Sequence, residues 1–302
     1  MFVLRRMPSE RRFRMPRDFG YILTVRCPDQ TGIVAAVSRF LADRGLTIEE
    51  ADHFHDQLEG HFFMRTAFKA SPEAAPLPLM ELEAGFAPIA RRYNMDWAFH
   101  PTGEKPRIVL AVSKSGHCLN DLLHRWRSGW LRADIVGVVS NHEDLREEVQ
   151  WHGLPYLYRP IKAETKVNAE ADFLAFMQEH QAHLLVLARY MQVLTPETVA
   201  ALHGRCINIH HSFLPGFKGA KPYHQAHARG VKMIGASAHY VTADLDEGPI
   251  IEQGVERVTH SDTPDDLIEI GRDLECTVLA RAVRWHCEHR ILLAGHRTVV
   301  FR

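Results

Sequence analysis

The sequence predicts an α/β protein of two domains, a ferredoxin-like domain followed by a doubly wound, mostly parallel sheet. Three observations carry this prediction. Residues 21–100 read in the order strand, helix, strand, strand, helix, strand. A linker rich in proline, glycine and charge follows at residues 101–106. Beyond it, continuous apolar runs alternate with helical stretches, which is typical of strands that are buried on both faces of a parallel sheet.

We place the first domain at residues 20–101. Apolar and polar residues alternate over residues 21–27, as they do in a half-buried strand. The turn at residues 28–32 leads into an apolar helical run at residues 33–41, and Gly45 fits the end of that helix. The other elements expected here are strands at residues 47–53, 61–68 and 96–100 and an amphipathic helix at residues 77–92.

We place the second domain at residues 106–302. The strands expected in its sheet are residues 108–112, 134–139, 154–157, 184–188 and 206–210. Helices are expected at residues 119–127 and 168–180, and a further helix between them runs through residue 150. A short helix and another strand follow. Thr263 and Pro264 suit the N-cap and first turn of a long helix that runs through Arg284 or beyond. Residues 290–301 read as a closing hairpin.

Composition excludes several classes of function. Lys and Arg number 36 against 37 Asp and Glu, so we expect no overall field for nucleic acid or an anionic membrane. The five cysteines are scattered without a C-x-x-C pair, which favours neither a disulfide framework nor a zinc site. Without a secretory or membrane-spanning run, we expect a cytoplasmic protein. The Arg-rich residues 1–19 are expected to form a poorly ordered tail rather than a nucleic-acid-binding arm.

The candidate catalytic residues lie between Cys206 and Glu252. Asn208 and His210 are two residues apart on an expected strand, so their side chains share one face. An amide NH₂ group beside an imidazole can donate two hydrogen bonds to one developing oxyanion. Asp246 arrives from the next element and can orient the imidazole or hold a water. These three groups suit chemistry at a carbonyl-like carbon. The alternative interpretation is that Asn208 and His210 only cap a turn at the end of the strand.

The same stretch carries a family resemblance. Its segments NIHHSFLP, GA, HQA, GASAHYV and DLDEGPII occur in the order found in the N10-formyltetrahydrofolate formyltransferases and hydrolases, which they resemble. The resemblance implies that Asn208, His210 and Asp246 are catalytic. It further implies a pterin pocket without a metal, and no cofactor beyond the folate substrate. The side chains implied for the pocket are Met191, Gln192, Val193, Leu194, Ala243, Asp244 and Leu245, with His239 as an accessory.

The turn after residues 108–112 departs from the transferase pattern. It reads SKSGHCL at residues 113–119, without G-x-G-x-x-G. In the purine-pathway formyltransferases a G-S-N-L-like turn binds the phosphate of the amine acceptor here. His117 and Cys118 are poor substitutes for such a phosphate site, and the turn is similar to that of the family branch that passes the formyl group to water. Cys118 is interpreted as a small buried residue, not as a nucleophile.

The turn DQTGIV at residues 29–34 gives the first domain a resemblance to ACT regulatory domains. Members of that family bind an amino-acid effector beside the glycine turn, where backbone N–H groups can take a carboxylate. This implies effector binding at Asp29 and Gly32. Thr47 stands where the usual pattern has Asn, so two alternatives stay open, amino-acid sensing and assembly alone. Pairing of ACT domains implies a homo-oligomer.

Together the two resemblances imply hydrolysis of 10-formyltetrahydrofolate to formate and tetrahydrofolate. Such a reaction would balance one-carbon pools and supply formate for purine synthesis. The expected partners are the folate, water as the formyl acceptor and an amino-acid effector, with no nucleic acid and no membrane. Two alternatives stay open: a transferase that formylates an amine, and an amino-acid-sensing protein with an inactive folate domain.

Overall fold

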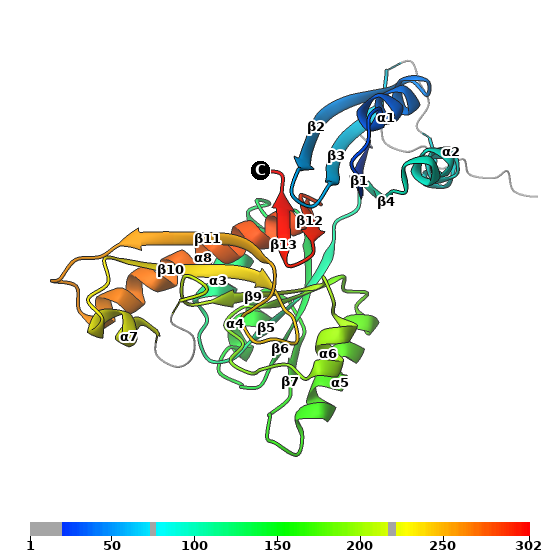
Figure 1. The fold of residues 1–302 in the computed structure, drawn as a ribbon. Coiled ribbons are helices and arrows are strands. Elements are labelled where there is room, and N and C mark those ends of the chain that lie inside the picture. Colours follow the sequence, from blue (N-terminus) through cyan, green and yellow to red (C-terminus); the bar gives the residue numbers. More distant parts are fainter. Residues whose placement is uncertain (1–19, 73–76, 217–221) are drawn as a thin grey trace, which may run out of the picture. The chain divides into compact units, whose positions relative to one another are not determined.

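The computed structural model describes residues 20–72, 77–216 and 222–302 (Figure 1). The tail predicted at residues 1–19 lies outside the described residues. The chain divides into two compact units, residues 1–104 and residues 105–302. Among the described residues, no helix combines the length and the apolar character needed to cross a bilayer.

The first unit contains one antiparallel sheet and two helices. Its elements are β1 (Gly20–Pro28), α1 (Ile33–Ala42), β2 (Leu46–Asp56), β3 (His61–Ala70), α2 (Leu79–Tyr93) and β4 (Asp96–Pro101). The strand order is β2-β3-β1-β4, which confirms the predicted ferredoxin-like fold. Alternate residues of β1, including Leu23 and Val25, form one apolar core with both helices. Helix α1 ends at the C-cap residue Asp43, and Gly45 follows with a positive φ of 67°.

The second unit is built on a mixed sheet. Its strands are β5 (Arg107–Val112), β6 (Asp134–Ser140), β7 (Tyr156–Tyr158), β8 (Leu184–Leu187), β9 (Cys206–His210), β10 (Met233–Tyr240) and β11 (Ile250–Arg257). Its helices are α3 (His117–Arg127), α4 (Arg146–Trp151), α5 (Lys166–Glu179), α6 (Pro196–Ala201), α7 (Pro222–Ala228) and α8 (Pro264–Cys287). The chain closes with a hairpin of β12 (Ile291–Ala294) and β13 (Arg297–Val300), as predicted.

The strand order of this sheet is β11-β10-β9-β8-β5-β6-β7. Strands β7, β6, β5, β8 and β9 are parallel, and β10 and β11 extend the sheet antiparallel at one edge. The predicted doubly wound, mostly parallel sheet is therefore confirmed. The sequence analysis did not predict α6, which begins after Thr195, whose side chain accepts a hydrogen bond from the backbone N–H of Thr198.

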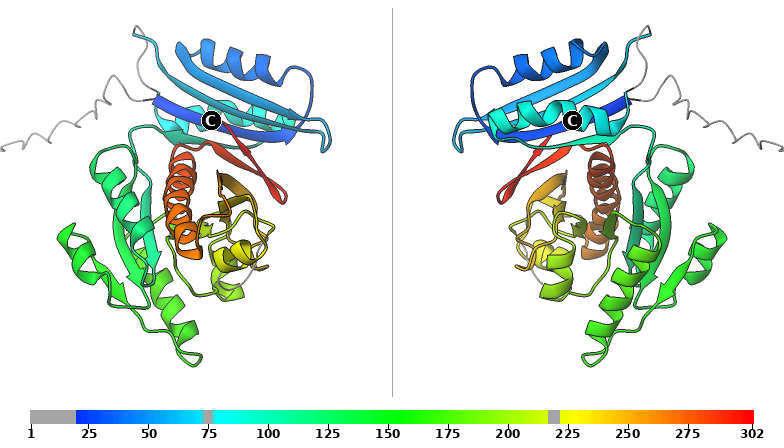
Figure 2. Two further views of the ribbon diagram at one scale, coloured as in Figure 1. Left: turned by 90° about the vertical axis from the view of Figure 1, so that its left-hand side faces the viewer. Right: turned by 90° about the vertical axis from the view of Figure 1, so that its right-hand side faces the viewer.

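Both faces of the sheet are buried. Ile108 and Leu110 of β5 pack in a core with α3 and α8, whereas Val109 and Ala111 pack in a second core with α5 and α6. Helices α5 (green) and α8 (orange to red) accordingly lie on different sides of these strands (Figure 2). Burial of successive residues on opposite faces explains why β5 reads as a continuous apolar run.

The direction in which the strands are added reverses between β5 and β8. From β5 the chain builds outward through β6 to β7, whereas β8 leads to β9 on the other side. In open α/β sheets, ligands bind beyond the carboxyl ends of the strands at this switch point. Ser113 directly follows β5, Arg189 follows β8, and His210 ends β9, so these three residues come from neighbouring strand ends.

Candidate active site

A cavity of about 220 Å³ opens beyond the carboxyl ends of β8 and β9. All the side chains that the sequence analysis assigned to catalysis and to folate binding line it. They are Met191, Gln192, Val193, Leu194, Asn208, His210, His239, Ala243, Asp244, Leu245 and Asp246. Arg189 and His211, which the sequence analysis did not assign to the site, also line this cavity.

Asn208 and His210 project from the same face of β9, as the two-residue period of a strand requires. In the antiparallel pairing of β9 with β10, Asn208 lies opposite His239 and His210 lies opposite Ser237. The side-chain nitrogen Nδ2 of Asn208 is 3.3 Å from Nε2 of His239. The pairing of two strands thus places one amide and two imidazoles in the cavity wall.

Asp246 reaches this group from the loop between β10 and β11. Its Oδ2 lies 3.3 Å from Nδ1 of His210, and its Oδ1 lies 3.7 Å from Nε2 of His239. Burial alone would raise the pKa of the Asp246 carboxyl, but the interactions with the two imidazoles outweigh it and hold the pKa well below its usual range. Asp246 is therefore a carboxylate at neutral pH. Its backbone φ of 58° is uncommon for a residue with a side chain, and such conformations concentrate at functional sites.

The two ring nitrogens of His210 have different surroundings. A carboxylate only accepts hydrogen bonds, so Nδ1 of His210 carries a proton and donates to Asp246. Nε2 is buried and has no hydrogen-bond partner among the described residues. A buried polar atom without a partner calls for an explanation, and His210 lines the cavity. Nε2 is thus the atom that a bound ligand or water would meet.

The main chain fixes His239. Its Nδ1 lies 2.9 Å from the carbonyl oxygen of Tyr240 and donates to it, because a carbonyl can only accept. That carbonyl packs against Gly248, where an added Cβ would lie 1.7 Å from the oxygen. Only glycine allows the two backbone segments to approach so closely. Gly248 therefore positions both His239 and the loop that carries Asp246.

The cavity wall at residues 191–194 is anchored to the turn after β5. The backbone N–H of Met191 donates to Oγ of Ser113 at 3.0 Å, and that hydroxyl donates to Oδ1 of Asn141 at 2.7 Å. Met191 is 57 % exposed and Leu245 is 61 % exposed, so apolar side chains border the cavity from both segments. An apolar rim with a few fixed polar groups is the usual composition of a small-molecule site.

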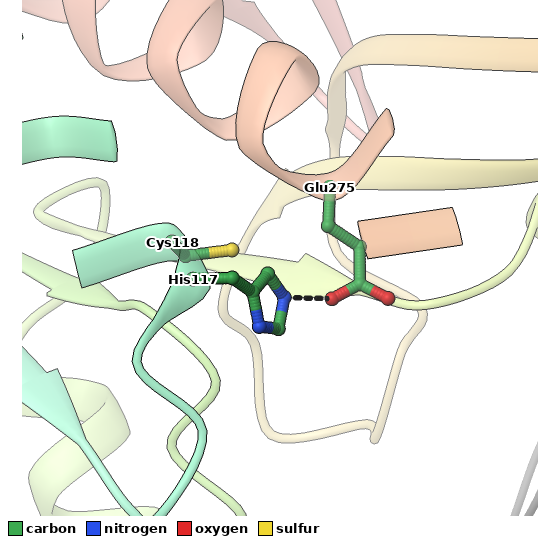
Figure 3. Close-up of side chains that lie close together, drawn as sticks. All are labelled: His117, Cys118 and Glu275. Carbon is green, nitrogen blue, oxygen red and sulfur yellow. Dashed lines mark hydrogen bonds and ion pairs between the residues drawn. The ribbon is translucent and has the colours of Figure 1, made fainter. Parts of the chain in front are cut away.

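A second polar group lies beside the cavity around Glu275 of α8, which is 1 % exposed. Its Oε2 accepts from Nε2 of His117 at 2.7 Å and forms an ion pair with Nε of Arg189 at 3.3 Å. Its Oε1 accepts from the hydroxyl of Tyr223 at 2.9 Å. Figure 3 shows the His117 ring directed from the start of α3 toward the carboxylate on α8, with the Cys118 thiol beside it. We call these four residues, His117, Arg189, Tyr223 and Glu275, the Glu275 network.

Among the described residues, only His117, Cys118 and Glu275 form a group of three metal-ligating side chains whose ligand atoms all lie within 4.8 Å of one another. Their surroundings suit an ion-pair network better than a cation, since both carboxylate oxygens already have partners and Arg189 adds a positive charge. Hydrogen bonding to the Cys276 side chain, together with burial, raises the pKa of the Cys118 thiol well above its usual value. Cys118 is thus a neutral, fully buried thiol, which agrees with its interpretation as a small core residue.

The Glu275 network was not predicted, although the sequence of α8 contains one signal of it. Glu275 falls within the apolar stripe of α8, between Leu274 and Val278, where an acidic residue is unexpected. Nothing in the local sequence indicates that Arg189 approaches it, because the two residues are far apart along the chain. His117 was identified as a departure from a phosphate-binding turn, but its partner could not be predicted.

The fold, a cavity at the sheet switch point and a polar trio without a nucleophile define an enzyme of the formyltransferase fold joined to an ACT domain. The formyl transferase family model matches residues 106–283, and the ACT domain model matches residues 21–75. The chain is 49 % identical over 288 residues to the formyltetrahydrofolate deformylase of Corynebacterium sp. strain P-1, covering 95 % of this chain and 100 % of that protein. The chain belongs to the formyltetrahydrofolate deformylase family.

Solved structures agree with this assignment. The structure of formyltetrahydrofolate deformylase from Burkholderia mallei has a TM-score of 0.89 at 53 % identity, covering 94 % of this chain and 99 % of that one. The structure of glycinamide ribonucleotide transformylase 1 from Symbiobacterium toebii is similar over a smaller share. Its TM-score is 0.63 at 29 % identity, and the match covers 67 % of this chain and 97 % of that one. The likeness to deformylases thus extends over far more of this chain than the likeness to this transformylase.

Proposed function

We propose that this enzyme hydrolyses 10-formyltetrahydrofolate to formate and tetrahydrofolate, with Asn208, His210 and Asp246 as its catalytic residues. The observation that carries the residue assignment is their convergence in one cavity wall, where Asp246 holds Nδ1 of His210 and Nε2 is left for a ligand. The activity follows from membership of the deformylase family. By this reaction the enzyme balances one-carbon pools and supplies formate for purine synthesis.

The reaction begins with attack of a water oxygen on the formyl carbon. The carbonyl oxygen becomes an oxyanion, which accepts hydrogen bonds from the Asn208 amide and from Nε2–H of a protonated His210. Asp246, a carboxylate, stabilises the imidazolium through Nδ1 and orients or deprotonates the attacking water. The C–N bond then breaks, N10 receives a proton from His210 or through water, and formate leaves. One water adds across one C–N bond, so the atoms balance.

The folate is bound by the two segments that border the cavity. Backbone groups of residues 191–194 and 243–245 face the polar edge of the pteridine, and the side chains of Met191, Val193 and Leu245 cover its faces. The cavity of about 220 Å³ is smaller than the roughly 300–1,000 Å³ of sites for whole drug-sized ligands. It therefore takes the ring end of the folate, and the glutamate end lies outside.

The first unit supplies regulation or assembly. Asp29 and Gly32 lie at the start of α1, with Asp29 3.1 Å from the imidazole of His55 and Gly32 in a left-handed conformation. These residues are the proposed contacts for an amino-acid effector. Pairing of ACT domains makes the enzyme a homo-oligomer. All five cysteines are free thiols, which fits a cytoplasmic location. The reaction needs no cofactor beyond the folate substrate.

The test is incubation with 10-formyltetrahydrofolate without any amine, following formate and tetrahydrofolate together. Hydrolysis predicts equal release of both. Tetrahydrofolate that appears only after an amine is added would identify a transferase, and release of neither product would identify a folate domain without activity. Repeating the assay with glycine and with methionine tests the effector site, for which a changed rate is expected in the presence of one of them.

A further inference from the structure

The Glu275 network gathers charged and polar side chains from four places in the second unit. His117 starts α3, Arg189 follows β8, Tyr223 lies on α7, and Glu275 lies on α8. The side chain of Glu275 is 2 % exposed, and those of Arg189 and His117 are 15 % and 18 % exposed. Burying charged groups is costly unless they are paired, so a network at this depth has to be satisfied internally.

The charges of the network are paired, although Nε of Arg189 is buried without a hydrogen-bond partner among the described residues and meets Glu275 only as an ion pair. Burial alone would raise the pKa of Glu275, but its hydrogen bonds with His117 and Tyr223 and the positive charge of Arg189 together lower it, so Glu275 is a carboxylate. Gly271, one turn before Glu275 on α8, leaves room for Tyr223, because an added Cβ would lie 2.1 Å from the tyrosine oxygen. Arg189 has a backbone φ of 65°, an unfavourable conformation for arginine. The fold therefore accepts local strain to keep this guanidinium in place.

Arg189 belongs to the catalytic cavity as well as to the network. It lines the cavity together with His210, His211 and the proposed folate segments. The ring centroid of His211 lies 5.2 Å from that of His210 and 6.2 Å from that of Tyr223. Burial, followed by the charge of Arg189, lowers the pKa of His211 to about 4.

Two polar side chains of the turn after β5 already have partners. The Ser113 hydroxyl is used between Met191 and Asn141, and the His117 imidazole is used by Glu275. The side chains around Arg189 are thus bonded to one another. An acceptor larger than water that approached His210 from the side of Arg189 would meet this guanidinium, which Glu275 holds by an ion pair.

We propose that Arg189, held by Glu275, is the specificity-determining residue that reserves the formyl acceptor position for water. This inference rests on the proposed hydrolysis and explains why the same catalytic trio does not transfer the formyl group to an amine. The two outcomes differ in one bond: attack by a water oxygen forms formate, and attack by an amine nitrogen forms a formamide. In both, the C–N10 bond breaks, N10 receives a proton and tetrahydrofolate leaves.

The test measures how the formyl group partitions between water and an added amine. Hydroxylamine is small, largely uncharged at neutral pH, and gives formylhydroxamate, which is measured beside formate. Arg189→Gly removes the side chain and suits the positive φ. We expect its ratio of formylhydroxamate to formate to rise at least about tenfold over the unaltered enzyme, after subtraction of the enzyme-free reaction. Gln181→Gly is the matched control, because Gln181 is exposed and also has a positive φ, of 51°, and its ratio should not change.

A second variant keeps the test decisive. Glu275→Gln preserves the shape of the side chain but removes the charge that holds Arg189, so a smaller rise in the same ratio is expected. If circular dichroism shows that Arg189→Gly does not fold, the product ratio of Glu275→Gln alone tests the proposal. A ratio that stays at the wild-type value while formate is still released overturns the inference, and a raised KM for the folate would then assign Arg189 to substrate binding. Absence of formate release by the unaltered enzyme would instead refute the proposed hydrolysis.

Discussion

Gly248→Ala is a small change that should disable the enzyme without unfolding it. The added Cβ would lie 1.7 Å from the carbonyl oxygen of Tyr240, whereas real Cβ contacts stay beyond 3.0 Å. The two backbone segments must therefore separate by about 1.3 Å or more. Either movement disturbs the 2.9 Å hydrogen bond that fixes His239 or shifts the loop that carries Asp246.

A displacement of this size is large for catalysis. A misplacement of about 1 Å can cost about 10²-fold in rate, so we expect kcat for formate release to fall by about that factor. Overpacking costs about 1–3 kcal/mol of stability, which leaves a folded protein whose Tm is lowered. The assay is formate release at saturating folate, with circular dichroism to establish the fold.

Gly254→Ala provides the control for overpacking. Its Cβ would meet only the side chains of Val278 and Leu274, the nearer at 2.8 Å, and Gly254 does not line the cavity. This variant should lose stability but keep its kcat. If Gly248→Ala retains a kcat within twofold of the unaltered enzyme, the positioning role of the 246–248 loop is wrong.

Three further variants test separate parts of the site. Ser113→Ala leaves the Met191 N–H without its partner, which costs about 1–3 kcal/mol and should raise KM for the folate about fivefold or more with little change in kcat. Asp246→Asn should abolish hydrolysis while keeping folate binding, as titration calorimetry can show. Because the pKa of Asp246 is depressed in the folded protein, its carboxylate stabilises the fold at pH values above the ordinary pKa of 3.8, and this stabilisation is lost as the pH falls below that value. The Tm of Asp246→Asn should therefore fall less steeply on acidification than that of the unaltered enzyme. Cys118→Ala should keep its kcat and lose about 1 kcal/mol of stability, whereas inactivation would make the thiol catalytic.

The second sheet and the site wall were predictable from sequence because they depend on short-range patterns. Continuous apolar runs such as residues 108–112 indicate strands covered on both faces, and the two-residue spacing of Asn208 and His210 determines that they share a face. The family resemblance then connected Asp246 with them. Each of these inferences uses information that lies within one element or one continuous motif.

What the sequence did not reveal depends on contacts between distant elements. The ion pair of Arg189 with Glu275 joins the end of β8 to the middle of α8, and no local pattern indicates that these two residues lie close together. The need for glycine at position 248 arises from the carbonyl of another segment. Likewise, α6 is only six residues long and was not predicted, because so short a helix carries too few apolar positions to show a period.

The central claim is that two side chains of β9 stabilise the oxyanion that forms when water attacks the formyl group. The most direct measurement is single-turnover formate release by Asn208→Ala and His210→Ala, with enzyme in excess over 10-formyltetrahydrofolate. Loss of one oxyanion donor costs about 10²–10³ in rate, and we predict at least that loss for each variant, with folate binding retained. A rate within tenfold of the unaltered enzyme in either variant would contradict the account.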